Sequence, residues 1–142
     1  MSGGNDLGIE PLRDATENEI LTYATKNDLP LLGVCRGLQF LCSQYGGRLT
    51  EDQTNRHVAT SHRVEISSDY GGFSRSQILE VNSFHNYVVD DPGSLDVFAV
   101  DGEGKVEGVF SDRQRIAAIM WHPERYTEYH PNDLFLIRSF FG

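Results

Sequence analysis

Only two cysteines, Cys35 and Cys42, occur in the 142 residues, and no basic and apolar leader opens the chain. A secreted disulfide framework is therefore not expected, and we predict a reduced, cytoplasmic protein. Long apolar runs are absent as well, since none approaches the roughly 20 residues that a helix needs to cross a bilayer. We therefore expect no membrane partner.

Positive charge is also scarce. Lys and Arg number 12 against 21 Asp and Glu, which gives a formal net charge of -9. An acidic surface repels the phosphate backbone, so nucleic acid is not expected as a partner. Hydrophobic residues make up 39% of the chain and charged residues 23%, as is typical of a globular protein. At this length we expect one domain, covering residues 1–142.

The apolar pattern predicts helices alternating with strands. Thr16 and Glu19 have capping-box spacing, which favours a helix at 16–27. The apolar runs at 29–34 and 116–120 are typical of strands buried on both faces of a parallel sheet. The other expected elements are helices at 36–45 and 133–141, strands at 62–66, 77–81, 87–89, 95–100 and 106–110, and a loop at 51–60.

Cys35 lies between Gly33 and Gly37, where a predicted strand meets a predicted helix. This is the layout of a nucleophile elbow, in which small neighbours let the chain turn sharply and present the nucleophile. The amides and the dipole of the following helix favour the thiolate, and the Arg36 amide is free to meet an oxyanion. On this pattern alone, a buried structural cysteine is an equally good interpretation.

His122-Pro123-Glu124 decides between the two interpretations. Pro123 favours an extended conformation at His122, and residues two apart on an extended chain face the same side. An imidazole can take the proton of Cys35 and return it to a leaving amine, while the carboxylate orients the ring. Because ligands gather at the carboxyl ends of strands in open α/β sheets, we predict a catalytic triad of Cys35, His122 and Glu124.

Other reactive side chains are given structural roles. The spacing of His57, His62 and His130 matches no metal-ligand pattern, so we expect surface or loop histidines and no metal site or cofactor. Cys42 is expected to pack in the core. A local structural contact is expected for Arg13 and Asp14.

Several segments together resemble the class I glutamine amidotransferases and their γ-glutamyl hydrolase relatives, the peptidase C26-like proteins. The resemblance is carried mainly by LPLLGVCRGLQFLCSQYGGRL and MWHPER, and it extends to SGGND, RDATENEIL, VNSFHNYVV and DGEGKVEGVF. It implies an α/β, three-layer, flavodoxin-like domain with a largely parallel sheet. Family members usually begin with further strands and helices, so the resemblance implies a partial catalytic domain that lacks its N-terminal portion.

The resemblance also implies roles for individual residues. The backbone amides of Gly4 and Arg36 would bind the oxyanion of the tetrahedral intermediate. The substrate's glutamyl end would be held by Gln39 and by a wall formed by Ser83, Phe84 and His85.

The expected function is hydrolysis of a γ-glutamyl amide, a small-molecule substrate, through a thioester at Cys35, which releases glutamate and ammonia or an amine. One alternative is a glutaminase subunit that supplies ammonia to a synthase partner. Another is a non-catalytic binding or stress protein, or an inactive remnant. The NSFH pattern favours the hydrolase, and a separately encoded N-terminal piece is a further possible partner.

Overall fold

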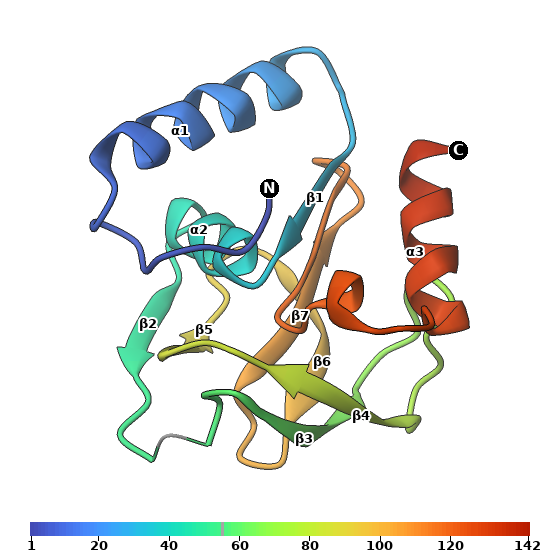
Figure 1. Cartoon of the computed structure of the whole chain (residues 1–142). Coiled ribbons are helices and arrows are strands. Elements are labelled where there is room, and N and C mark those ends of the chain that lie inside the picture. The colour runs from blue at the N-terminus through green and yellow to red at the C-terminus, as the bar shows by residue number, and fades with distance from the viewer. Residues whose placement is uncertain (55) are drawn as a thin grey trace.

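The computed structural model describes residues 1–54 and 56–142 and consists of one sheet with helices packed against it (Figure 1). The predicted loop at 51–60 includes position 55, which lies outside the described residues. The helices are α1 (Pro11–Lys26), α2 (Arg36–Gln44) and α3 (Pro131–Phe141), with a short 3₁₀ helix η1 (Pro123–Arg125). The strands are β1 (Leu31–Val34), β2 (Arg48–Glu51), β3 (Thr60–Ile66), β4 (Ile78–Ser83), β5 (Tyr87–Asp91), β6 (Asp96–Asp101), β7 (Val106–Ser111) and β8 (Ile116–Ile119).

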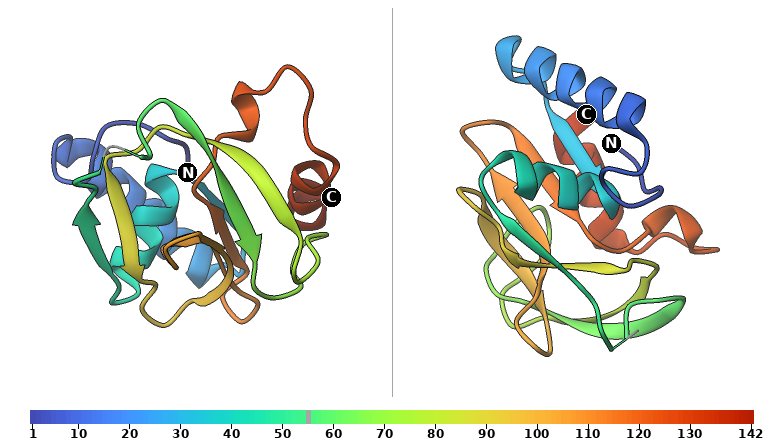
Figure 2. Two further views of the ribbon diagram at one scale, coloured as in Figure 1. Left: turned by 90° about the horizontal axis from the view of Figure 1, so that it is seen from below. Right: turned by 90° about the vertical axis from the view of Figure 1, so that its left-hand side faces the viewer.

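Parallel pairing is confined to β1 and β8 in the described sheet. The main strand order is β1-β8-β7-β6-β3-β4, and β5 pairs with β7 on one side and β2 on the other. Every described pair except β1–β8 is antiparallel. The prediction of a largely parallel sheet is therefore wrong: the sheet is mixed, and it curls (Figure 2). Short connections such as that between β6 and β7 join antiparallel strands, whereas parallel strands need a long crossover.

The strand expected at 116–120 is confirmed as β8, which is buried on both faces. Ile116 and Ala118 pack in the core that includes α2, while Ala117 and Ile119 pack in the core that includes Leu136 of α3. Helices α2 and α3 therefore lie on opposite faces of the sheet at β8. The carboxyl ends of β1 and β8 are adjacent, because these two strands pair in parallel.

The first residue is anchored beside β1. The Met1 ammonium donates to the Leu32 carbonyl at 2.8 Å, and the Val34 amide donates to the Met1 carbonyl at 3.0 Å. Gly37 makes this approach possible, because a Cβ there would lie 2.9 Å from the Met1 oxygen. The loop that follows Met1 is thus held close to the start of α2.

Two local predictions are wrong. Helix α1 begins at Pro11, a residue whose fixed φ suits the first helical turn. Thr16 therefore lies inside the helix, where its hydroxyl donates to the Leu12 carbonyl and caps nothing. Strand β2 overlaps the start of the predicted loop; it has no alternating apolar pattern, and Leu49 is its only apolar residue.

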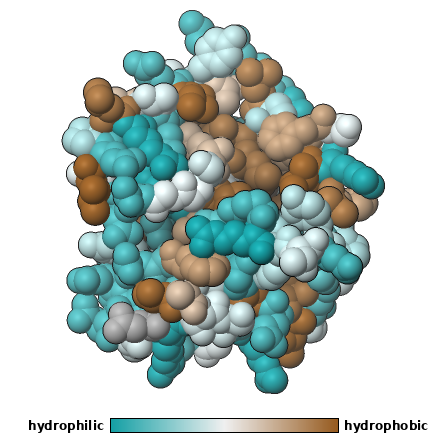
Figure 3. All heavy atoms as spheres, in the orientation of Figure 1, coloured by the Kyte–Doolittle hydropathy of each residue, from teal (hydrophilic) through white to brown (hydrophobic). Residues whose placement is uncertain are grey.

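An apolar hollow of about 270 Å³ lies between α3 and the ends of β1 and β8. Its lining includes Leu32, Val34, Ile119, Leu134 and Ile137. Apolar side chains are visible on the face of the molecule that includes α3 (Figure 3). None of the helices in residues 1–54 and 56–142 has the length and apolar character of a membrane span.

Candidate active site

Cys35 occupies the turn between β1 and α2 with a backbone φ of 50° and ψ of -104°. A positive φ is strained for any residue that carries a Cβ. Gly33 allows the tight turn, because a Cβ there would lie 2.9 Å from both the Gly37 carbonyl carbon and the Leu41 Cδ1. The strained elbow that the glycine pattern predicts is therefore confirmed.

The protonation of Cys35 differs from the expectation. Burial raises the pKa of the thiol to about 11, and the hydrogen bond from the Arg36 amide acts in the opposite direction. Desolvation of the thiolate thus outweighs the stabilisation available at the start of the helix. The expectation that the start of the helix favours the thiolate over the thiol is therefore wrong for the chain without substrate.

Alkylation of Cys35 by iodoacetamide should rise steeply with pH. Because the thiolate is the nucleophile, the rate should increase about tenfold per pH unit between pH 7 and 10. Peptide mapping at each pH separates Cys35 from Cys42, whose pKa burial raises to about 12. A rate for Cys35 that levels off below pH 8 would contradict the raised pKa.

His122 and Glu124 form the pair that was expected. The Nδ1 of His122 lies 2.6 Å from the Glu124 Oε1, although the 3₁₀ turn η1, not extended chain, brings the two residues together. Because the Glu124 carboxylate occupies Nδ1, the other ring nitrogen of His122, Nε2, is available for proton transfer. Among the described residues no hydrogen bond joins Cys35 to His122, and such contacts are often longer before substrate binds. The catalytic role of all three stays a prediction.

Asn82 holds the backbone of His122 with both ends of its side-chain amide. Its Oδ1 accepts from the His122 amide at 2.8 Å, and its Nδ2 donates to the His122 carbonyl at 2.9 Å. The Asn82 backbone amide in turn donates to the Tyr126 hydroxyl at 2.8 Å. No role for Asn82 was predicted from the sequence, where the available signal was a polar residue within the VNSFH segment.

Replacing Asn82 with alanine should therefore misplace His122. We expect kcat to fall by about 10- to 100-fold with a smaller change in KM, because small displacements of a catalytic group cost this much. Asn132→Ala is the matched control, since the Asn132 side chain bonds to Gln77. Steady-state kinetics and circular dichroism on both variants test this. Equal losses in the two variants would contradict a positioning role for Asn82.

The opening loop lies directly against His122. A Cβ on Gly3 would come within 2.4 Å of the His122 Cε1, so only glycine permits this approach. Arg13 holds the loop by donating to the Gly3 carbonyl at 2.8 Å and the Ser2 carbonyl at 3.0 Å. Gly4 follows in the same loop, where a Cβ would meet the Arg13 guanidinium, and its predicted oxyanion role stays a prediction.

A buried ion-pair network connects this loop to the elbow. The Arg36 guanidinium pairs with Asp14 and Glu17, and Arg13 contacts Glu17 at 3.3 Å. The structural contacts expected for Arg13 and Asp14 are confirmed, whereas the buried Glu17 was not predicted. Because the Arg36 side chain points into this network, only its backbone amide is directed to Cys35.

Of the predicted substrate residues, Phe84 contacts His122, whereas Gln39 lies one helical turn after Cys35 and lines a cavity whose described lining includes none of the predicted triad. Gln39 is buried, donates to the Tyr87 carbonyl at 3.1 Å and lines a cavity of about 360 Å³. Phe84 is partly exposed, with its ring edge-on to the His122 ring at a centroid distance of 5.8 Å. The Arg125 guanidinium lies 4.1 Å from the centre of the Phe84 ring.

The side chains of Ser83 and His85 engage other parts of the protein. The Ser83 hydroxyl donates to the His57 carbonyl at 2.9 Å. The His85 ring contacts the Tyr87 carbonyl at 2.8 Å and stacks on His57 at a centroid distance of 4.7 Å. Because successive side chains of an extended segment alternate in direction, only Phe84 of the three turns to His122.

His57 lies in a loop, as expected, and His62 lies on β3, but neither is simply a surface histidine, because both belong to one cluster. His57 is buried, with its Nδ1 3.0 Å from the Asp52 Oδ2 and its Nε2 3.2 Å from the Asp101 Oδ2. The hydrogen bond to Asp101 is the main cause that raises the pKa of His57 to about 9. Sequence separation concealed this cluster, whereas His130 is exposed as predicted.

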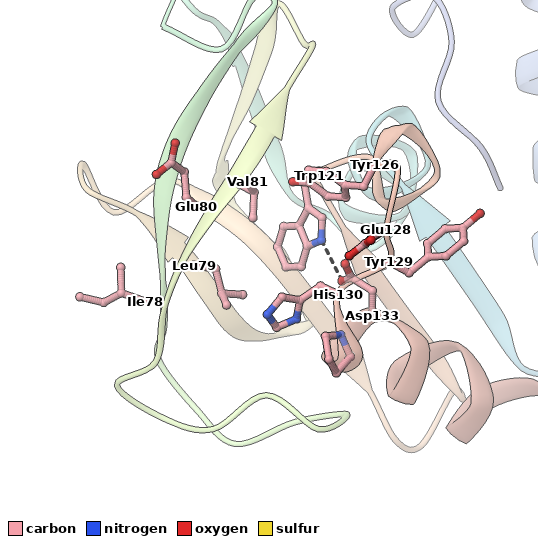
Figure 4. Close-up of a pocket in the computed structure, with 11 residues that line it drawn as sticks. Ile78, Leu79, Glu80, Val81, Trp121, Tyr126, Glu128, Tyr129, His130 and Asp133 are labelled. Atoms are coloured by element: carbon pink, nitrogen blue, oxygen red, sulfur yellow. Dashed lines mark hydrogen bonds between the residues drawn. The ribbon is translucent and has the colours of Figure 1, made fainter.

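A cavity of about 450 Å³ between β4 and α3 is separate from these residues (Figure 4). Trp121 directs its ring into it and donates from Nε1 to the Asp133 Oδ1 at 3.0 Å. Cys35, His122 and Glu124 are absent from its described lining. We therefore assign no catalytic step to this cavity.

The sequence matches the family model of peptidase C26 over residues 4–124. A putative glutamine amidotransferase-like protein of Lactococcus lactis is 34% identical, over 81% of this chain and 54% of its own length. The γ-glutamyl-CDP-amidate hydrolase of Campylobacter jejuni is 27% identical, over 100% of this chain and 68% of the relative. A subunit of the glutamine-hydrolysing GMP synthase of Methanococcus maripaludis is 26% identical, over 91% of this chain and 65% of that subunit.

A crystal structure of a glutamine amidotransferase from Thermotoga maritima has the same fold. It aligns with a TM-score of 0.74 and 18% identity over 96% of this chain and 59% of the solved chain. The chain thus spans about half to two thirds of the length of these relatives.

Proposed function

Because the chain belongs to the peptidase C26 family, we propose that it hydrolyses a γ-glutamyl amide through a thioester at Cys35. The observation that carries this proposal is the strained elbow at Cys35, at the end of a strand adjacent to the one that leads to the His122–Glu124 pair. A core cysteine with only a packing role has no need of a positive φ or of a neighbouring carboxylate-held imidazole.

In the proposed reaction, His122 Nε2 takes the proton from the Cys35 thiol while the sulfur attacks the γ-carbonyl carbon of the substrate. The oxyanion that forms accepts hydrogen bonds from the backbone amides of Arg36 and Gly4. When the C–N bond breaks, the imidazolium gives its proton to the leaving amine. Water then attacks the thioester, with His122 again as the base, and glutamate is released.

The raised pKa of Cys35 fits a nucleophile that loses its proton as the substrate binds. Transfer to His122 forms an ion pair in a desolvated site, and Glu124 steadies the imidazolium. Glu124 is half-exposed, with 54% of its side chain accessible, so we expect its contribution to be smaller than that of His122.

The glutamyl end of the substrate is proposed to contact Gln39 and Phe84. Ser83 and His85 would contribute backbone groups, because their side chains are hydrogen bonded within the protein. The departing amine would then lie toward the 51–60 segment.

The second candidate function is that of a glutaminase subunit for a synthase partner. The match to a GMP synthase subunit favours it, since that relative is a component of a larger enzyme. A hydrolase that acts alone should need no partner, whereas a glutaminase subunit should become more active when its synthase is present.

Glutamate release from glutamine and from a series of γ-glutamyl amines tests the proposal. We expect the purified chain to release glutamate from at least one γ-glutamyl amine without a second protein. Activity that requires an added synthase would support the second candidate. No release under either condition would support a non-catalytic protein and contradict both.

A further inference from the structure

Four buried or half-buried side chains from separate segments converge on the concave side of the curled sheet. They are His57 before β3, His62 on β3, His85 after β4 and Glu107 on β7. One potential ligand atom of each lies within 4.8 Å of those of the others. The Glu107 Oε1 is 3.6 Å from the His62 Nε2 and 3.9 Å from the His85 Nε2.

This cluster also contains most of the unsatisfied buried polar atoms in the part of the chain that is described. Four side-chain atoms there are buried without a hydrogen-bond partner, and three belong to the cluster: His62 Nε2, His85 Nε2 and Glu107 Oε2. Buried polar groups in folded proteins are nearly always paired, so three unpaired atoms in one cluster call for a common partner.

Hydrogen bonds on the outer side of two rings orient their inner nitrogens. His85 Nδ1 lies 2.8 Å from the Tyr87 carbonyl, which can only accept, so Nδ1 is the donor and Nε2 has the lone pair. His57 Nδ1 likewise faces the Asp52 carboxylate at 3.0 Å. Histidine ligands of metals are usually held in this way by a carbonyl or a carboxylate.

We propose that His62, His85 and Glu107 bind one divalent metal ion of the zinc type, with His57 Nε2 as the fourth ligand. Bonds of about 2.0–2.2 Å in a tetrahedron place ligand atoms about 3.3–3.6 Å apart, close to the separations of the two histidine nitrogens from the Glu107 Oε1. Imidazole nitrogens favour zinc and its neighbours over Mg²⁺ or Ca²⁺, which prefer oxygen.

Binding would release the Nε2 proton of His57 to solvent and exchange the contact of Nε2 with Asp101 for a bond to the ion, while Asp52 keeps Nδ1 in place. Four protein ligands leave no open position for a substrate, which makes the site structural. The ion would fasten the segment around His57 and the turn containing Phe84 to the sheet. The ion would take no direct part in the reaction proposed at Cys35.

Cobalt titration of the metal-free chain tests the proposal, because Co²⁺ takes zinc sites and gives strong visible absorption when four-coordinate. We expect one equivalent to bind and Zn²⁺ to displace it. Cys35 and His122 are a competing place for the ion, so the titration is repeated with Cys35→Ala. That variant should give the same stoichiometry and the same visible spectrum.

Glu107→Gln keeps the size of the side chain and removes the anionic ligand. Its affinity for Co²⁺ should fall by more than about 100-fold, since even loss of an outer contact costs 10- to 100-fold. Glu65→Gln, at an exposed position on β3, is the matched control and should bind as the unmodified chain does.

Circular dichroism verifies that the variants fold. If Glu107→Gln does not fold, His62→Gln replaces it, because that side chain is partly exposed. The proposal is overturned if the unmodified chain takes up no cobalt, if Cys35→Ala loses the ion, or if a folded cluster variant keeps full affinity. If the unmodified chain takes up no cobalt, the four side chains are held together by hydrogen bonds and not by an ion.

Discussion

Cys35→Ala should abolish the release of glutamate from any γ-glutamyl amide that the unmodified chain hydrolyses. Without the sulfur no thioester can form. Direct attack by water on the substrate would then be accelerated only by substrate binding and by the amides that bind the oxyanion. Loss of the nucleophile in a coupled triad lowers kcat by about 10⁶-fold in a well-studied case, which puts the expected residual rate below detection.

Cys42→Ala is the matched control for this experiment. It removes the other cysteine, which is fully buried in the core on α2, and should lower stability more than activity. Both variants should be assayed for glutamate and compared by thermal unfolding. Glutamate release by Cys35→Ala at a rate near that of the unmodified chain would contradict the mechanism.

His122→Asn should produce the second-largest loss, at least about 10⁴-fold in kcat/KM. Because burial raises the pKa of Cys35 to about 11, very little thiolate exists at neutral pH without a base to accept the proton. The leaving amine also loses its proton donor. His130→Asn is the matched control, since His130 is exposed and lies after η1.

The pH profile distinguishes this role from a structural one. In His122→Asn the residual rate should continue to rise with pH toward the pKa of the thiol, because hydroxide must replace the missing base. Glu124→Gln should retain more activity than His122→Asn, since an orienting group is partly replaceable. A Glu124 variant that is less active than the His122 variant would contradict the assigned roles.

Local signals predicted the elbow and the core strand well. The glycines around Cys35 require a tight turn whatever the rest of the fold, and the apolar run at 116–120 requires burial on both faces. These features depend on residues close in sequence, so the sequence alone was sufficient. The same runs were expected to be strands of a parallel sheet, and β1 and β8 do pair in parallel, although their pairing with each other was not predicted.

Long-range arrangements were beyond reach of the sequence. The hydrogen bonds between the Asn82 side-chain amide and the His122 backbone join residues 40 positions apart, and the Arg36–Glu17 ion pair joins residues 19 positions apart. The resemblance implied a largely parallel sheet, and the apolar runs could not correct it, because they reveal burial but not strand direction. His57, His85 and Glu107 likewise converge only because the sheet curls.

The balance at Cys35 could not be predicted either. A helix N-terminus favours the thiolate, while burial favours the thiol, and only the structure gives the extent of burial. The degree to which Cys35 is buried determines whether desolvation or the helix N-terminus has the larger effect on the pKa of the thiol.

Intact-protein mass after treatment with a diazoketone analogue of glutamine tests the central claim most directly. The reagent alkylates a nucleophile in a glutamyl pocket with loss of N₂, so it requires no knowledge of the natural amine. We predict one adduct per chain, mapped to Cys35 and suppressed by excess glutamine or γ-glutamyl substrate. No adduct on a chain whose Cys35 still reacts with iodoacetamide at high pH would contradict the claim that these residues form a glutamyl-amide hydrolase site.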